Sequence, residues 1–193
     1  MSNQSKNISP LATSAYAPGR VELLGNHTDY NEGVVLGAAI DRGLTVRGRK
    51  RDDGMISIES STMGYVEIAR SALRPLEENR WANYALGVAN ELIALSIPVE
   101  GFSAEVSGDL AAGCGLSSSA AFELATALFL LKLYGRNIGS LEIAKVCQRA
   151  EHRYAGVRWA CSTRSLHSLA APITPCSSIA GAKKCGRFRS LKD

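Results

Sequence analysis

The sequence lacks the cysteine spacing of a disulfide framework or a zinc site. Its 193 residues include five cysteines, an odd number, and no two of them stand in Cys-x-x-Cys spacing. A disulfide framework normally uses an even number of cysteines, and zinc sites commonly use Cys-x-x-Cys pairs. We therefore expect a reduced protein without structural zinc, and we predict a cytoplasmic location.

Long hydrophobic runs are also absent. The longest mostly apolar run, Leu124–Leu131, is too short to cross a bilayer and directly follows Glu123. The N-terminus is polar and has no apolar segment of the signal-peptide type. We expect a soluble chain with no membrane partner, in which residues 1–13 form a mobile N-terminus.

The third absence is a patch of Lys and Arg interleaved with aromatic residues. The net charge of +4 is uneven, because residues 158–193 carry seven Lys and Arg against one acidic residue, whereas residues 1–157 carry 15 against 17. The basic surplus therefore belongs to the final segment alone. We predict no nucleic-acid partner, and the sequence leaves the oligomeric state open.

What the sequence does contain is the pattern of a mixed fold with a substantial core, since 46% of its residues are hydrophobic. The alternation of Leu44–Arg49 and Ile56–Ser60 around a polar turn predicts an antiparallel hairpin. Strands followed by helices indicate an α+β fold rather than a regular βαβ repeat. Further strands are predicted at Val34–Ile40, Tyr65–Ala69 and Phe102–Val106, and helices at Trp81–Leu95, Ala120–Leu131 and Leu141–Tyr154, the last with Ser140 as its N-cap.

The stretch Asp109–Ala121 combines a glycine-rich loop with the start of a helix. Gly113 and Gly115 are followed by three hydroxyls at Ser117–Ser119. Backbone N–H groups and the positive end of a helix dipole bind anions at such a position. The spacing differs from that of a Walker loop, and no lysine follows. Its residues alone fit either an anion-binding loop or an ordinary loop that leads into a Ser-capped helix.

A second polar cluster lies in the loop Gly25–Gly33. Asn26, His27, Asp29 and Asn31 provide hydrogen-bond donors and acceptors within a few residues. Such groups suit a polyhydroxylated ligand, because each of its hydroxyls needs a partner. Taken alone, the same stretch also fits a hydrated turn.

Three separated motifs together resemble the GHMP sugar kinases, and most closely the galactokinases among them. The resemblance covers about residues 16–157, in the family's order. It implies an α+β GHMP kinase N-terminal domain, similar to domain 2 of ribosomal protein S5, at residues 14–157 of a truncated chain. The motifs are Gly19-Arg20-Val21 with Gly25–Asn31, then Gly113–Ala121, then Ala150-Glu151-His152 with Tyr154–Val157, and Trp81–Tyr84 with Gly87-Val88 adds to them.

The resemblance also implies a reaction and its residues. The family phosphorylates galactose to galactose 1-phosphate, with ATP and Mg²⁺ as cofactors, and Arg20 would stabilise charge on the transferring phosphoryl group. The sugar would contact Asn26, His27, Thr28 and Asp29. The ATP phosphates would lie on Gly113, Cys114, Gly115, Leu116, Ser117, Ser118 and Ser119. Mg²⁺, which prefers oxygen ligands, would bind Ser119 and Glu151.

The chain departs from the family pattern at three positions. Glu22 stands where the family commonly has Asn, and Asn26 where it commonly has Glu, which keeps a kinase for N-acetylgalactosamine or another sugar open. Thr163 occupies the place of the catalytic Asp, and threonine cannot accept a proton at neutral pH. A non-catalytic regulator that binds sugar and nucleotide is therefore the alternative to a kinase.

We expect residues 158–193 to be a non-homologous, out-of-frame tail, and we hypothesise a frameshift close to Arg158. Codons for Trp159–Arg164, read one base earlier, permit a Gly-Leu-Leu-Asp-Gln series that resembles the family's continuation. Cys176–Ala182 permit Val-Phe-Leu-Asp-Cys-Arg-Ser in the same frame, and the coding DNA around codon 158 tests the hypothesis. Without the base and the C-terminal half, we expect the 193-residue polypeptide to be inactive and poorly folded.

Overall fold

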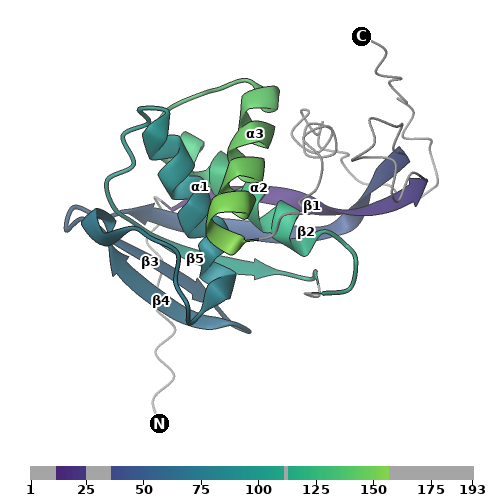
Figure 1. Cartoon of the computed structure of the whole chain (residues 1–193), viewed down its shortest axis with the longest axis horizontal. Coiled ribbons are helices and arrows are strands. Elements are labelled where there is room, and N and C mark those ends of the chain that lie inside the picture. Colours follow the sequence, from purple (N-terminus) through teal and green to yellow (C-terminus); the bar gives the residue numbers. More distant parts are fainter. Residues whose placement is uncertain (1–11, 25–35, 111–112, 157–193) are drawn as a thin grey trace.

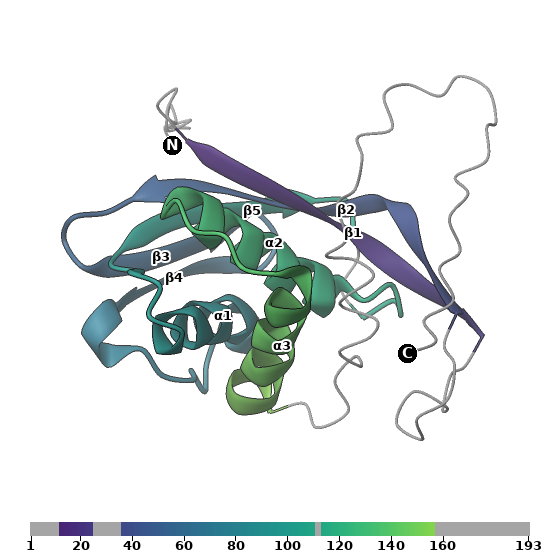
Figure 2. The ribbon, with the colours of Figure 1, turned by 90° about the horizontal axis from the view of Figure 1, so that it is seen from above.

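The computed structural model describes residues 12–24, 36–110 and 113–156, and the structural statements below concern these residues. They form two layers, a five-stranded sheet and a set of three helices that covers one of its faces (Figures 1 and 2). This arrangement confirms the α+β class. Because only one face is covered, the sequence alternates along most strands between apolar and polar side chains.

The strands are β1 (Thr13–Leu24), β2 (Leu36–Lys50), β3 (Met55–Ser60), β4 (Gly64–Ala69) and β5 (Phe102–Gly108). Their order in the sheet is β1-β2-β5-β3-β4. β2 pairs antiparallel with both β1 and β5, whereas β5 runs parallel to β3. β4 then closes one edge as the antiparallel partner of β3.

The predicted hairpin of Leu44–Arg49 with Ile56–Ser60 is wrong, although both segments are strands. β5 lies between them, with Arg47 opposite Glu105 on one side and Ile58 opposite Ala104 on the other. The hairpin that does form joins β3 to β4. The local alternation predicts that a segment is a strand, but it cannot identify a partner that comes some 50 residues later in the chain.

The helices are α1 (Asn83–Ala94), α2 (Ser118–Leu133) and α3 (Ser140–Ala150), and a short π-helix, η4 (Glu151–Ala155), continues α3. α2 packs against β1, β2, α1 and α3, which explains why its sequence is apolar on almost every side. Two 3₁₀ turns, η2 (Arg70–Ala72) and η3 (Arg80–Ala82), precede α1. Within the described ranges, every helix is too short or too polar to cross a membrane.

The core lies between the sheet and the helices. Phe102 of β5 and Phe129 of α2 are both fully buried and meet edge to face, with ring centroids 6.0 Å apart. On the opposite face of the sheet, Arg47, Glu59 and Glu105 are exposed in one cross-strand row. The alternation along β2, β3 and β5 therefore separates a core face from a solvent face.

The last predicted helix differs from the expectation at both ends. Ser140 is the first helical residue rather than the N-cap, and Gly139, which precedes it, has no side chain to cap the helix. The α-helix stops at Ala150, four residues before the end of the predicted segment at Tyr154, and the chain continues in the wider π turn. Gly156 then ends the turn with a φ of +70°, a left-handed conformation that suits glycine.

Candidate active site

The loop between β5 and α2 adopts an unusual backbone conformation. Gly113 and Gly115 have φ values of +77° and +72°, and Ser117 has +56°. A Cβ added to either glycine would meet no other atom within 4 Å, so it is the left-handed backbone that requires glycine there. A serine in this region is uncommon, and such strained residues cluster at active sites.

Ser117 precedes the first turn of α2 but does not cap it with its side chain. Its carbonyl oxygen instead accepts the first helical bond, from the N–H of Ala121 at 3.0 Å. The N–H groups at the start of a helix have no partner within the helix. This helix therefore presents donors and the positive end of its dipole beside the loop, as an anion-binding site requires.

Two strands hold the loop in place. The backbone N–H of Arg20 in β1 donates to the carbonyl of Leu116 at 3.0 Å. The N–H of Gly43 in β2 donates to the Asp109 carboxylate at 2.9 Å. Arg20 is also buried, so the structure brings this predicted residue and the predicted phosphate loop together.

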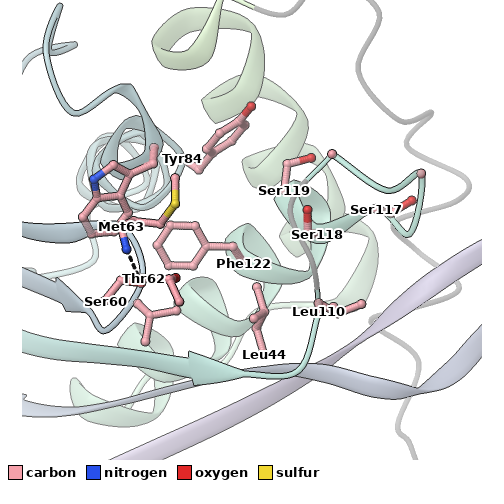
Figure 3. A pocket seen from close by; sticks show the side chains of 14 residues that line it. Leu44, Ser60, Thr62, Met63, Tyr84, Leu110, Ser117, Ser118, Ser119 and Phe122 are labelled. Atoms are coloured by element: carbon pink, nitrogen blue, oxygen red, sulfur yellow. Dashed lines mark hydrogen bonds between the residues drawn. The ribbon is translucent and has the colours of Figure 1, made fainter.

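A pocket of about 550 Å³ opens directly beside the loop. Figure 3 shows Ser117, Ser118 and Ser119 at one end of it, and Thr62 and Met63 toward the other. Aromatic side chains form much of its wall: Trp81 and Phe122 stack with ring centroids 6.3 Å apart and an interplanar angle of 24°. The volume and the aromatic wall suit a flat heterocyclic group attached to an anion.

Asn83 explains why Trp81 and Tyr84 stand at this pocket. Its buried amide accepts a hydrogen bond from the Leu76 N–H at 2.8 Å and donates to the Leu76 carbonyl at 2.9 Å. These bonds fix the segment that leads into α1. The indole Nε1 of Trp81 is buried and has no hydrogen-bond partner among the described residues.

Two buried carboxyl groups lie behind the pocket. Glu151 is 5% exposed and Glu123 is fully buried. Both oxygens of Glu123, and Oε2 of Glu151, have no hydrogen-bond partner within the described ranges. Glu123 follows Ser119 by four residues on α2, so the two share one face of the helix. A buried carboxyl group without a partner is costly unless a proton or a cation neutralises it.

The surroundings of these acids shift several pKa values. Burial raises the pKa of Glu151 to about 7. Burial, and then the charge of Glu151, raise the pKa of Glu123 well above its usual range. Burial and both carboxylates also raise the pKa values of Tyr84, in the pocket wall, and of Cys147, on α3. The acids are therefore close to one another and to the pocket.

The donor set fits a hard divalent cation in part. Such a cation prefers oxygen ligands, and the unpartnered Oε2 of buried Glu151 is one. The hydroxyl of Ser119, at the pocket end of α2, is the second predicted ligand. Among the described residues no three His, Cys, Asp or Glu form a metal site by themselves, so a cation here would need further oxygens, such as those of phosphate.

The other predicted site residues are distributed as follows. Gly113–Ser119, Arg20 and Glu151 are all described, and the loop and Arg20 meet. Asn26, His27, Thr28 and Asp29, predicted to contact the sugar, lie outside the described residues, as does Thr163. Their roles stay predictions.

Sequence reasoning missed Glu123. One signal was available, because a carboxylate stands one helical turn after Ser119 inside an otherwise apolar helix. Thr126 extends the same polar line, and its hydroxyl is also buried with no partner among the described residues. A polar line through an apolar helix indicates an internal site rather than a solvent face.

Two family models match the chain. "GHMP kinases N terminal domain" matches residues 83–162, which include the loop, α2, α3 and Glu151. "Galactokinase galactose-binding signature" matches residues 7–50, which include Arg20 and the polar loop after β1.

Among the similar proteins of known function are galactokinases. Galactokinase of Homo sapiens is 43% identical over 155 residues, which cover 76% of this chain and 38% of the relative. Galactokinase of Chloroflexus aurantiacus is 38% identical over 155 residues, 77% of this chain and again 38% of the relative. The chain therefore spans about two fifths of the length of the curated relatives it matches.

Solved structures show the same fold. Lactococcus lactis galactokinase complexed with galactose aligns with a TM-score of 0.77 and 29% identity, over 83% of this chain and 42% of that one. Methanococcus jannaschii mevalonate kinase aligns with a TM-score of 0.71 and 21% identity, over 84% and 52% of the two chains. The second likeness concerns the fold alone.

Proposed function

The chain belongs to the GHMP kinase family, and on this premise we propose that it carries the ATP site of a galactokinase. The reaction is transfer of the γ-phosphoryl group of ATP to the anomeric hydroxyl of galactose, which gives galactose 1-phosphate. One observation carries the proposal. The left-handed loop at Gly113–Ser117 opens onto an aromatic pocket, so one continuous site fits a phosphate chain joined to a flat base.

Different residues of the site bind different parts of ATP. Trp81 and Phe122 form the wall against which the base stacks. The backbone N–H groups of the loop and of the first turn of α2 donate to phosphate oxygens. Arg20 neutralises charge on the transferred group, which is the main protein contribution in phosphoryl transfer.

Ser119 and Glu151 hold Mg²⁺ in this proposal. When bound, the cation supplies charge neutralisation at the phosphate oxygens. Burial raises the pKa of Glu151, and a bound cation would favour the charged form of this carboxyl group. A cytoplasmic location, where both ATP and free sugar are available, is part of the proposal.

Galactose is the proposed sugar because a galactokinase galactose-binding signature matches residues 7–50. Asn26–Asp29 fall within that match. The exchange of residue types at Glu22 and Asn26 keeps N-acetylgalactosamine as the competing sugar. A direct comparison of the two sugars as ligands decides between them.

Thr163 favours a second candidate, a regulator that binds sugar and nucleotide without catalysis. Loss of a general base lowers the rate by about 10²–10⁴. We therefore expect the 193-residue chain to bind ATP but to release ADP at no more than a small fraction of the rate of an intact kinase.

The experiment is ATP titration of the full 193-residue chain by calorimetry, with the variant Gly115→Ala. A Cβ in the left-handed region costs roughly 1–2 kcal/mol, so we expect the affinity for ATP to fall about tenfold. Gly135→Ala is the matched control, since Gly135 has a φ of +64° and equally open surroundings but lies at the far end of α2. An equal ATP affinity in both variants would contradict the proposed loop.

A coupled ADP-release assay with galactose separates the two functions. Saturable galactose binding without ADP release favours the regulator. Turnover at the rate of an intact kinase would overturn the role assigned to the missing base. Binding of neither ligand would reject both functions for this chain.

A further inference from the structure

One buried carboxylate, on the neighbouring helix α1, anchors the end of α3. Glu91, on α1, is 2% exposed. Its Oε2 accepts a hydrogen bond from Nε of Arg149 at 2.7 Å, and its Oε1 accepts one from a terminal nitrogen of Arg153 at 2.9 Å. Both carboxylate oxygens are therefore used, in charge-assisted bonds of the stronger kind.

The two arginines stand on either side of Glu151 in the sequence. Residues four apart share a helix face, whereas residues two apart point to opposite sides. Arg149 and Arg153 thus form one edge of the helix, while Cys147 and Glu151 form the other. The exposures agree, since Cys147 and Glu151 are buried and Arg153 is exposed. We call the hydrogen bonds of Glu91 to Arg149 and Arg153 the clamp, and the helix edge that carries the two arginines the arginine edge. The clamp sets the rotation of the helix about its axis, and with it the direction of Glu151.

Close to Glu91, helix α1 approaches the end of α3 and the π turn unusually closely at Gly87. Gly87 lies one turn before Glu91 on α1, and a Cβ there would stand 2.9 Å from Cβ of Tyr154 and 3.1 Å from Cβ of Ala150. The absence of a side chain at Gly87 therefore lets α1 approach the start of the π turn. The π turn begins at Glu151 itself.

From this geometry we propose that Glu91 is a positioning residue for the cation site. Through Arg149 and Arg153 it holds the π turn against α1 in the rotation that directs Glu151 toward α2. The inference rests on the proposed function, because it takes Glu151 as a ligand of the divalent cation.

The test is Mn²⁺ titration of the full 193-residue chain, with free Mn²⁺ measured by electron paramagnetic resonance. Glu91→Gln keeps the shape of the side chain and removes its charge. Changes to groups that orient a metal ligand lower metal affinity by about 10–100-fold, so we expect a loss of about tenfold. The affinity for ATP in the presence of EDTA should stay unchanged, which a general loss of folding would not allow. Hydrogen exchange should rise at the amides of residues 151–155.

Glu142→Gln is the matched control. Glu142 accepts a hydrogen bond from Arg149 at 3.3 Å, but it is partly exposed and lies on α3 itself. Its loss removes a contact of the same arginine without releasing the π turn from α1. We expect the Mn²⁺ affinity to stay within about twofold of the unchanged chain.

Arg153→Gln keeps the proposal testable if Glu91→Gln fails to fold. Arg153 is largely exposed, so its loss removes one arm of the clamp at little cost to the fold, and we expect a smaller but measurable fall in Mn²⁺ affinity. Failure of the unchanged chain to bind Mn²⁺ would reject the cation site itself. Binding by the unchanged chain with equal affinity in the Glu91→Gln and Arg153→Gln variants would reject the clamp alone.

Discussion

Two helices that pack against α3 each carry a buried carboxyl group, and the surroundings of these two groups are opposite. Glu91 of α1 has an arginine on each of its oxygens. Glu123 of α2 has no hydrogen-bond partner on either oxygen among the described residues. Since an unpaired buried acid costs stability, a chain that retains one inside an apolar helix has a use for it. Glu91 is therefore paired within the fold, whereas the oxygens of Glu123 and the Oε2 of Glu151 have no hydrogen-bond partner among the described residues.

The same difference links the fold to the proposed chemistry. Paired Glu91 fixes the segment that carries Glu151, and unpaired Glu123 and Glu151 leave oxygens available beside the pocket that Tyr84 lines. A preorganised cation site requires a ligand that is held rigidly in place and oxygen atoms that no hydrogen-bond donor occupies. The predictions below test this contrast through stability, which is independent of the tests of ligand binding.

The largest expected effect comes from the same substitution on both sides, Glu91→Met and Glu123→Met. Glu91→Met removes two charge-assisted hydrogen bonds, and we expect the free energy of unfolding to fall by about 1–3 kcal/mol. Glu123→Met replaces an unpaired buried acid by an apolar side chain of similar length, and we expect a rise of about 1–3 kcal/mol. Urea unfolding without divalent cations measures both.

Opposite signs would support the contrast between the two acids. If both variants lose stability equally, then Glu123 has a structural partner and the distinction fails. Thr126→Val, which removes a buried hydroxyl without a partner one turn further along α2, provides the uncharged control. We expect its effect on stability to be small.

The second prediction concerns pH. The pKa of Glu151 rises from 4.5 to about 7 in the fold because the group is buried. Between these values the folded chain binds more protons than the unfolded chain, so the free energy of unfolding decreases as the pH rises from about 4.5 to about 7. Burial and the charge of Glu151 also raise the pKa of Glu123, so this group contributes to stability in the same direction. Urea unfolding at several pH values, without divalent cations, checks the slope.

Glu151→Gln should remove its part of this slope, whereas Thr126→Val, which has no ionisable group, should retain it. A stability that rises with pH across the window would contradict the assignment of a buried, unpaired carboxyl group to Glu151. Saturating Mn²⁺ should reduce the slope as well, because a bound cation favours the charged carboxylate.

Much of this arrangement could be predicted from the sequence, and the failures have physical causes. The glycines and serines of the loop and the apolar run of α2 are local patterns, so their structure followed from composition and periodicity. The insertion of β5 between β2 and β3 depends on a pairing between distant segments, which alternation along each strand does not encode.

Local sequence patterns also cannot predict the roles of the buried glutamates. Glu151 was identified through a motif that resembles a family. Glu91 stands in no such motif, and its role depends on two arginines 58 and 62 residues away. Glu123 was overlooked because, in the sequence alone, a single charged residue in an apolar helix looks like the boundary of the apolar run. Only the folded structure brings Glu151, the first residue of η4, close enough to Glu123 for its charge to raise the pKa of Glu123.

The smallest expected change in stability is that of Gly87→Ala, which acts on the spacing between α1 and the π turn. Alanine in a helix interior is favoured over glycine by about 1 kcal/mol. Against this gain, the new Cβ would stand 2.9 Å from Cβ of Tyr154, so the turn must move outward. We expect the two terms to leave the free energy of unfolding within about 1 kcal/mol of the original value, while Mn²⁺ affinity falls because Glu151 moves with the turn. Unchanged affinity with unchanged stability would show that the close approach at Gly87 does not position Glu151, and the clamp would then act through the arginine edge alone.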